Sequence, residues 1–475
     1  MERVVNYILS RFPHQPTEGQ RAACEAMVEF LYDADPMAAF VLSGYAGTGK
    51  TTLVSALIQS APAMRLKTLL LAPTGRAAKV LAGYSGQPAF TIHKKIYQTY
   101  MSADGIVRMG RATNKHTYTL FIVDEASMIG LSSDGVGRRS LLEDLVDYVA
   151  EGSHCRLMLI GDEAQLPPVG ASESPALDLE YLRAFSHLKV HHYRLTEVVR
   201  QQHLSGILYN ATLLRRRLAE LAGGGQVELP LFDLEGYDDV VRLTGADLEE
   251  VLNREYDNDG IEQVAVITRS NKRANLFNQE IRNRVLYREE EVNAGDYLMV
   301  VKNNYYWLDA DSEMGFIANG DMVELLGVRN HQELYGFHFV DATLRFVDYP
   351  NVAPVDCKLL LETLHSESPS LTQEESQHLF ESVAEDYADM PNKADRLRAI
   401  RQNPYYNALQ VKFSYALTCH KTQGGQWETI IVDQGYLKEE MLDREYLRWL
   451  YTAITRATQK VYFLNFEDNF FDVEI

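Results

Sequence analysis

The chain has 475 residues, of which 46% are hydrophobic, so it can bury several cores and by length holds about three domains. No uninterrupted apolar run approaches the roughly 20 residues that a membrane span needs, and the first residues lack a signal-peptide pattern, so we expect a cytoplasmic protein. The four cysteines lie far apart, which favours neither a disulfide framework nor a zinc site.

The formal net charge of −20 ordinarily argues against a nucleic-acid partner, because phosphate binding depends on Lys and Arg side chains. Part of the acidic excess lies in residues 362–389, which contain no Lys or Arg and are most simply a solvated helical face. Seven Lys and Arg residues fall between Arg76 and Lys115. They form either a local basic track or scattered surface charges.

The segment 44–51 reads GYAGTGKT, a complete G-x-x-x-x-G-K-T run between the apolar residues 38–42 and a helical pattern. Such a loop points backbone N–H groups at a phosphate chain and adds the positive end of the following helix. We expect Lys50 to meet the β- and γ-phosphates and Thr51 to hold Mg²⁺; a glycine-rich turn without a ligand is the alternative. The residues expected to line this P-loop site are Gly44, Ala46, Gly47, Thr48, Gly49, Lys50, Thr51 and Thr52.

After the P-loop, short apolar strands alternate with polar turns and helices, at 67–72, 75–82, 119–123 and 156–160. This pattern predicts a parallel sheet covered by helices on both faces. A glycine-rich connection at 222–225 precedes a second series, at 263–268, 271–286, 411–417, 429–432 and 460–465. We therefore predict two α/β domains, the first over 1–205 and the second over 206–290 and 404–475.

Two insertions interrupt these domains. Residues 100–118 lie between two strands of the first domain and could form a β-hairpin around 103–105. Residues 291–403 contain short alternating segments at 297–301, 322–326, 336–340 and 342–347, which predict a small antiparallel barrel or sheet. The tail of this second insertion, about 371–401, is predicted to be helical with a break at 390–392.

Asp124 and Glu125 directly follow the predicted strand 120–123. Ligands of open α/β sheets bind at the C-terminal ends of strands, so this pair fits a Walker B position. Asp124 would share the Mg²⁺ with Thr51, and Glu125 would accept a proton from the attacking water. The alternative is an acidic pair that caps the next helix.

Three further polar residues lie where they could reach a γ-phosphate. Gln165, in the loop 161–170 after another buried strand, could accept a hydrogen bond from the attacking water and donate one to a phosphate oxygen. Arg200 and Arg456 could each act as an arginine finger that stabilises transition-state charge. For a lone arginine, an ordinary surface ion pair is the alternative.

Taken in order, these segments resemble the motifs of the superfamily 1 helicases, specifically the RecD-like and Dda-like subgroup that moves 5′ to 3′ on single-stranded DNA. The resemblance runs from about residue 16 to 457. It implies an ATP- and Mg²⁺-dependent DNA helicase with two RecA-like domains, acting on single-stranded and tailed duplex DNA, and it favours the arginine-finger interpretation. A DNA-stimulated ATPase that binds or remodels complexes without unwinding is the alternative. The matching segments are 17–20, 44–51, 72–78, 91–93, 124–127, the Gln165 loop, the Arg200 segment, 418–424 and the Arg456 segment.

The resemblance also implies roles for residues that no other argument singles out. Gln20 would read the adenine, and Gly424 would approach the nucleotide from the second domain. The hairpin would be a strand-separating wedge and residues 291–403 an SH3-like accessory domain. In two places the chain departs from the pattern, because Val199 replaces a common tyrosine and Gln426 a common glutamate. The residues implied to lie along the DNA strand are Pro73, Thr74, His93, Thr418 and His420.

Side chains of the two insertions could also contact DNA. The hairpin offers Met101, Ile106, Val107 and Met109 as apolar wedge residues, although an unremarkable surface hairpin is an equal alternative. In the larger insertion, the run Tyr305-Tyr306-Trp307 beside Lys302 could stack on bases, but such a cluster more often forms the core of a small barrel.

Overall fold

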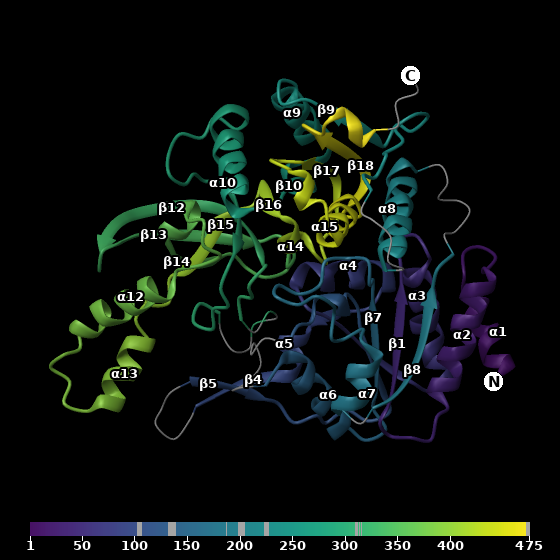
Figure 1. Ribbon diagram of the computed structural model, residues 1–475. Helices are drawn as coiled ribbons and strands as arrows, with labels where there is room; N and C mark the ends of the chain where they lie inside the picture. The colour runs from purple at the N-terminus through teal and green to yellow at the C-terminus, as the bar shows by residue number, and fades with distance from the viewer. Residues whose placement is uncertain are drawn as a thin grey trace.

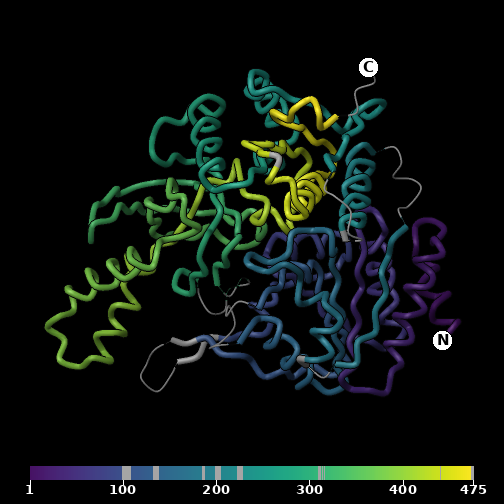
Figure 2. The backbone as a smooth tube through the Cα atoms, viewed as in Figure 1, coloured from purple at the N-terminus to yellow at the C-terminus, as the bar shows by residue number. Residues whose placement is uncertain are grey.

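Two parallel sheets and a closed β-barrel organise the chain, as the computed structural model shows (Figure 1). The structure describes residues 1–101, 107–131, 139–186, 188–197, 205–222, 228–308, 312, 314 and 316–471, with backbone only at 99–101, 107–108, 185–186, 222 and 439. The α/β domain that contains the N-terminus packs against the one that contains the C-terminal strands, and the barrel projects to one side of both (Figures 1 and 2).

The first sheet has six parallel strands in the order β3-β2-β6-β7-β1-β8. Successive residues of its central strand β1 enter different cores, Ala39 and Val41 on one face and Phe40 and Leu42 on the other. The near-continuous apolar strands of the sequence therefore follow from helices on both faces. The elements are α1 Glu2–Leu9, α2 Glu18–Leu31, β1 Ala38–Gly44, α3 Lys50–Ser60, β2 Lys67–Ala72, α4 Gly75–Ser85, β3 Ala89–Thr91, α5 Ile92–Ile96, β6 Thr119–Val123, α6 Leu141–Glu151, β7 Arg156–Gly161, α7 Leu179–Ser186 and β8 Lys189–Leu195.

The predicted hairpin is present. Strand β4, Tyr97–Met101, pairs antiparallel with β5, Val107–Arg111. The turn between them, and with it Ile106, lies outside the described residues, and the side chains of Met101 and Val107 are not described either. Met109 is half-buried against the first domain, so the base of the hairpin is anchored in that core.

The second sheet has five parallel strands in the order β16-β10-β17-β18-β9. Helix α8 packs with α15 in one core, through Leu214 and Leu218 on the first helix and Leu447 and Leu450 on the second. The two predicted RecA-like sheets are therefore confirmed. The elements are α8 Gly206–Ala222, β9 Val240–Leu243, α9 Leu248–Asp259, β10 Val264–Thr268, α10 Asn271–Glu280 with a π-helical turn Ile281–Val285, β16 Ala416–Thr418, α14 Cys419–Thr422, β17 Trp427–Asp433, α15 Arg444–Ile454 and β18 Ala457–Leu464.

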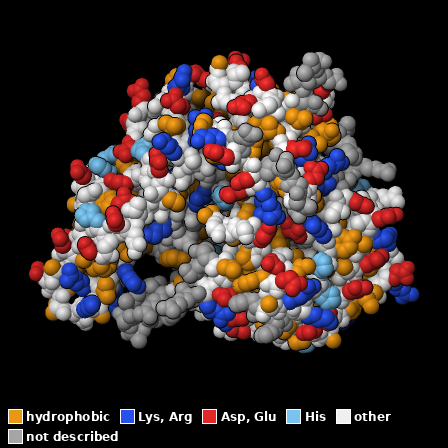
Figure 3. Space-filling model, in the orientation of Figure 1, with side chains coloured by type: hydrophobic (Ala, Val, Ile, Leu, Met, Phe, Trp, Pro, Cys, Tyr) orange, Lys and Arg blue, Asp and Glu red, His pale blue; other side chains and the backbone are white. Residues whose placement is uncertain are grey.

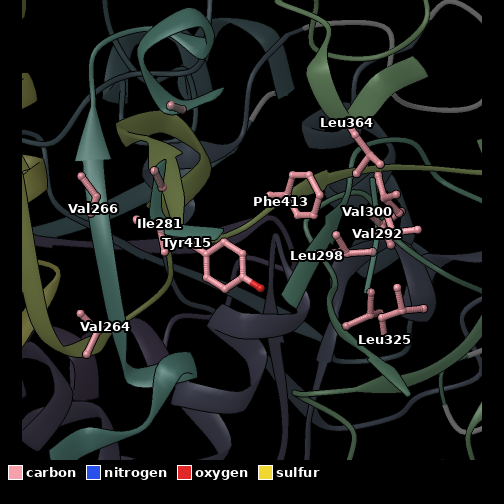
Figure 4. Close-up of a cluster of buried hydrophobic side chains, with 14 of the residues drawn as sticks. Val264, Val266, Ile281, Val292, Leu298, Val300, Leu325, Leu364, Phe413 and Tyr415 are labelled. Carbon is pink, nitrogen blue, oxygen red and sulfur yellow. The ribbon is translucent and has the colours of Figure 1, made fainter. Parts of the chain in front are cut away.

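The larger insertion forms a closed five-stranded barrel, which confirms the predicted accessory barrel. Its core continues into the second domain, since Val264 and Val266 of β10 share a cluster with Leu298 and Leu325 of the barrel (Figure 4). This shared core fixes the barrel to the second domain. The elements are β11 Tyr297–Val300, β12 Met322–Leu334, β13 Phe337–Phe346, β14 Val355–Leu360, α11 Glu362–His365, α12 Gln373–Glu385, α13 Lys393–Arg401 and β15 Leu409–Phe413.

The segment 411–417, expected to be one strand of the second α/β domain, is divided between the barrel and the sheet. Residues up to Phe413 form β15 of the barrel, and β16 of the second sheet begins at Ala416. Between them the Tyr415 hydroxyl donates to Asp296 Oδ1, which ties the crossing point to the start of the barrel. The structure thus places 409–413 outside the second sheet, and the other predicted domain limits remain predictions.

The remaining expectations concern membranes and cysteines. Within the described ranges, no helix is both long and apolar enough to cross a bilayer. All four cysteines are buried free thiols.

Candidate functional site

The P-loop lies between the end of β1 and the start of α3, at the C-terminal edge of the first sheet. Gly49 has φ = 84°, a left-handed conformation that glycine adopts without a steric penalty, and it begins the helix. A Cβ at Gly44 would lie 2.9 Å from the Cβ of Leu195. The Lys50 ammonium donates to the carbonyls of Gly44 and Tyr45, at 2.6 and 2.9 Å, and so lies across the loop that a phosphate would enter. Thr51 is exposed and Thr52 half-buried on the first turn of α3.

Asp124 and Glu125 follow β6 at the same edge of the sheet. Asp124 accepts from the Tyr84 hydroxyl at 2.6 Å and from the Glu125 N–H at 2.8 Å. Glu125 has a left-handed backbone, φ = 51°, and its carboxylate lies 3.6 Å from the Arg456 guanidinium. Burial raises the pKa of Glu125 because it disfavours the ionised carboxylate, while the Arg456 charge opposes that shift. The negative charge of this buried carboxylate is therefore stabilised by the Arg456 guanidinium of the second domain.

Gln165 lies in the loop after β7 and lines a cavity of about 540 Å³ that also contacts Tyr45 and Asp162. Its Oε1 is buried and accepts no hydrogen bond within the described part of the chain. Ser127 lines the same cavity, and its buried hydroxyl also has no hydrogen-bond partner among the described residues. A buried acceptor without a donor is costly, so this site suits a ligand or water molecule that can donate to it.

Helix α15 of the second domain binds the first domain through side chains that the sequence did not single out. The Tyr451 hydroxyl donates to Asp162 Oδ2 at 2.6 Å and accepts from the Ala46 N–H of the P-loop at 2.8 Å. One turn earlier, Arg448 pairs with Glu173 at 2.6 Å. Thr452 accepts from the Leu166 N–H at 2.8 Å. The signal that could have found them is a set of polar residues at helical spacing on a largely apolar helix, Arg444, Arg448, Tyr451 and Thr452.

Two of the predicted residues contact the first domain from the second. Arg456 is buried, donates to Thr452 O at 3.1 Å and reaches Glu125, so the structure brings it to the predicted catalytic carboxylate. Gly424 lies against the start of α4, where an added Cβ would be 2.8 Å from the Cβ of Ala77, rather than against the P-loop. Arg200 lies outside the described residues.

Two protein-family models match this chain in the regions that the structure folds into the two α/β domains. An AAA domain matches residues 15–223, and a UvrD-like helicase C-terminal domain matches 413–464. The chain is 25% identical to the ATP-dependent RecD2 DNA helicase of Deinococcus radiodurans over 461 residues, which cover 94% of this chain and 50% of that protein. It is 29% identical to the ATP-dependent DNA helicase dda of Enterobacteria phage T4 over 187 residues, 39% of each chain.

These matches support the resemblance to the RecD-like and Dda-like helicases of superfamily 1. The chain spans about half the length of its RecD2 relative. Among solved structures, a Pif1 helicase studied for DNA unwinding at forked dsDNA is 16% identical, with 97% of this chain and 95% of that chain covered and a TM-score of 0.46.

Gln20, which the family resemblance assigns to the adenine, is fully buried in this structure. Its Oε1 accepts from the Thr17 N–H at 3.0 Å and its Nε2 donates to Thr48 O at 3.2 Å. Together with the Thr17 side chain it completes a capping box at the start of α2, a pattern readable in the run Thr-Glu-Gly-Gln. Gln20 here supports the P-loop, and contact with an adenine stays a prediction.

The residues expected along the DNA strand lie at the C-terminal edges of both sheets. Pro73 and Thr74 follow β2, where Thr74 caps α4 by accepting from the Ala77 N–H at 3.2 Å. His93 lies in α5 after β3, the strand paired with β2. Thr418 and His420 begin α14 of the second domain. The two groups come close at Gly424, where an added Cβ would lie 3.3 Å from Thr74 Oγ1. The structure thus brings the expected DNA-contacting segments of both domains together, and their role stays a prediction.

Proposed function

We propose that this protein is an ATP-driven DNA helicase that translocates 5′ to 3′ along a single strand and unwinds tailed duplex DNA in the cytoplasm. The observation that carries the proposal is the approach of Arg456, from the second domain, to Glu125 of the first, beside the P-loop. Domain approach and ATP hydrolysis would then depend on the same pair of residues.

The residues around the P-loop fit ATP with Mg²⁺. Thr51 offers an exposed hydroxyl and Asp124 a carboxylate, which are the hard oxygen ligands that Mg²⁺ takes. Held by these two side chains, Mg²⁺ would supply positive charge against the phosphates. Lys50 would exchange its two loop carbonyls for phosphate oxygens.

Hydrolysis would then use side chains from both domains. Glu125 would accept the proton of the attacking water, and Gln165, whose Oε1 has no donor within the described residues, would orient that water. Arg456 would stabilise the charge that develops on the γ-phosphate, as an arginine finger does.

The contacts of α15 offer a route from the nucleotide to the DNA. Tyr451 joins the P-loop N–H of Ala46 to Asp162, and Thr452 holds the loop after Gln165. When hydrolysis changes the P-loop, these contacts would shift α15 and with it α14, which carries His420 and packs against α15. Alternating grip on the strand by the two domains would turn this opening and closing into a step.

The proposal is tested with purified full chain on duplexes that carry a 5′ tail, a 3′ tail or no tail. We expect ATP-dependent unwinding of the 5′-tailed duplex only. Lys50→Ala should abolish DNA-stimulated ATP hydrolysis. Lys67→Ala, which removes an exposed lysine at the opposite edge of the first sheet, should retain it. Near-normal turnover by Lys50→Ala would refute the proposed site, and ATP hydrolysis without unwinding of any duplex would favour the remodelling alternative.

A further inference from the structure

A second cavity lies between the hairpin and the helical tail of the barrel, away from the P-loop. Its volume is about 620 Å³, and its walls come from Met109 of β5, the residues after β11 and the end of α13. Figure 3 shows a hollow on this face, between the projecting α12–α13 arm and the region of the hairpin. The volume falls within the roughly 300–1,000 Å³ usual for sites that enclose a small ligand.

The charge of the cavity wall is opposite to that of the chain as a whole. Three cationic side chains line it, Lys302, Arg398 and Arg401, and no Asp or Glu is among the described lining residues. The chain has 66 acidic against 46 basic residues, so a wall whose described charged side chains are all cationic differs from the composition of the chain. Burial lowers the pKa of the Lys302 ammonium because it disfavours the charged form. An anion in the cavity would supply a counter-charge to this ammonium.

Tyrosines complete the wall, and the protein holds them in place. Tyr305 packs against Phe316, with ring centroids 4.8 Å apart, and Tyr306 packs edge-on against Trp307 at 4.8 Å. The Trp307 indole donates to Asn407 O at 2.7 Å, which fixes this run to the segment before β15. Tyr305 and Tyr306 are each 38% exposed, so they are available for stacking.

The cavity is also connected to the segment expected to contact DNA. Asn303, on the cavity wall, accepts from the Asn319 N–H at 2.7 Å. The Asn319 side chain in turn accepts from the Lys421 ammonium at 2.8 Å, next to His420 on α14. Asn319 therefore joins the cavity wall to α14, the helix that carries His420.

We propose that this cavity binds a nucleotide of unpaired DNA, with its phosphate against Lys302 and Arg401 and its base against Tyr306. The proposal rests on the proposed function, which supplies the unpaired strand. Cations that neutralise phosphate together with aromatic rings that accept any base are the combination that holds single strands without sequence preference. The strand is either the one along which the protein moves or the one it displaces.

The test compares charge reversals on one helix. Arg401→Glu changes the cavity wall, whereas Lys393→Glu makes the same charge change at the other end of α13, at an exposed residue that does not line the cavity. Binding of a fluorescent fork with two unpaired tails is measured by anisotropy over a series of salt concentrations, without ATP. We expect Arg401→Glu to weaken binding about tenfold and to lower the salt slope by about 0.7, the value for one phosphate contact on a single strand. Lys393→Glu should bind as wild type.

Two further measurements keep the test decisive. Lys302→Glu makes a charge reversal on the part of the cavity wall that comes from the barrel, and it serves as the second variant if Arg401→Glu does not fold. The thermal midpoint of each variant shows whether it is folded. Photo-crosslinking of 5-iododeoxyuridine, placed in one tail at a time, should label peptides that contain Tyr305 or Tyr306, and the labelled tail identifies the strand. Equal binding by all variants, or crosslinks from neither tail in these peptides, would overturn the proposal. If the cavity proposal fails in this way but the wild type still hydrolyses ATP in response to DNA, the proposed helicase function stands. If the wild type shows no DNA-stimulated ATP hydrolysis, the proposed helicase function is overturned.

Discussion

Replacing Tyr451 by Phe tests the hydrogen bonds that join the two α/β domains. The change removes one hydroxyl and keeps the ring, which is fully buried among apolar side chains of the second domain. That hydroxyl donates to the Asp162 carboxylate and accepts from the Ala46 N–H. The variant therefore loses two interdomain hydrogen bonds without opening a large cavity.

The expected magnitude follows from these two partners. A hydrogen bond to a charged group contributes about 1.5–3 kcal/mol and a neutral one about 1 kcal/mol, and both partners stay desolvated when the hydroxyl is removed. Among the described residues, Asp162 then keeps the Ala164 N–H alone as a side-chain partner, at 2.9 Å from its other oxygen. We expect a loss of about 3 kcal/mol in the free energy of unfolding, which for a domain of this size lowers the thermal midpoint by roughly 6–12 °C.

The matched control is Tyr256→Phe in α9. The Tyr256 hydroxyl is also buried, but it has no hydrogen-bond partner among the described residues. The same atom is removed without breaking a bond, so we expect the thermal midpoint to stay the same or rise. Both variants and the wild type are compared by differential scanning calorimetry at one scan rate. Equal midpoints for Tyr451→Phe and Tyr256→Phe would refute the argument that the Tyr451 hydroxyl holds the domains together.

Three other substitutions test the site and the barrel. Glu125→Gln should keep ATP binding but slow hydrolysis by about 10²-fold or more, since it removes the proton acceptor; unchanged turnover in a steady-state ATPase assay would exclude Glu125 as the base. Arg456→Lys keeps the charge but cannot reproduce the guanidinium contacts with Thr452 and Gly425, so hydrolysis should fall roughly 10³-fold while fluorescent ATP still binds; loss of binding as well would indicate a structural role. Burial raises the pKa of Asp321 from 3.8 to about 7. The folded state therefore holds a proton that the unfolded chain lacks between about pH 4 and 7, and stability falls as the pH rises through that range. Asp321→Asn should raise the thermal midpoint more at pH 8 than at pH 5, and equal shifts at both would contradict this.

Much of the candidate site could be predicted because its parts are local. The loop 44–51 joins a strand to a helix in consecutive residues, and Asp124 and Glu125 follow a strand directly. Gln20 shows the limit of such motifs. Its capping box is also local and the structure shows the amide bonded to Thr17 and Thr48, while the adenine contact that the family resemblance implies stays a prediction.

The barrel was predicted from alternating residues, but its last strand was not. Residues 411–417 read VKFSYAL, a mainly apolar run that by composition alone looks like one strand. Only the pairing of Leu298 with Phe413, and of Val266 with Ala416, assigns its two halves to different sheets. Strand pairing across more than a hundred residues depends on the packing of the whole domain, which no local pattern contains.

The sequence by itself determined the two α/β domains, the inserted hairpin and barrel, and the place of the loop 44–51 and of Asp124 and Glu125 at strand ends, because neighbouring residues fix backbone conformation at turns and strand ends. Only the tertiary structure decided which groups face one another across the domains. Tyr451 meets Ala46 across 405 positions in the chain, and Arg456 meets Glu125 from the other domain. Such contacts arise because α15, a largely apolar helix, packs its polar residues against the loops of the first sheet.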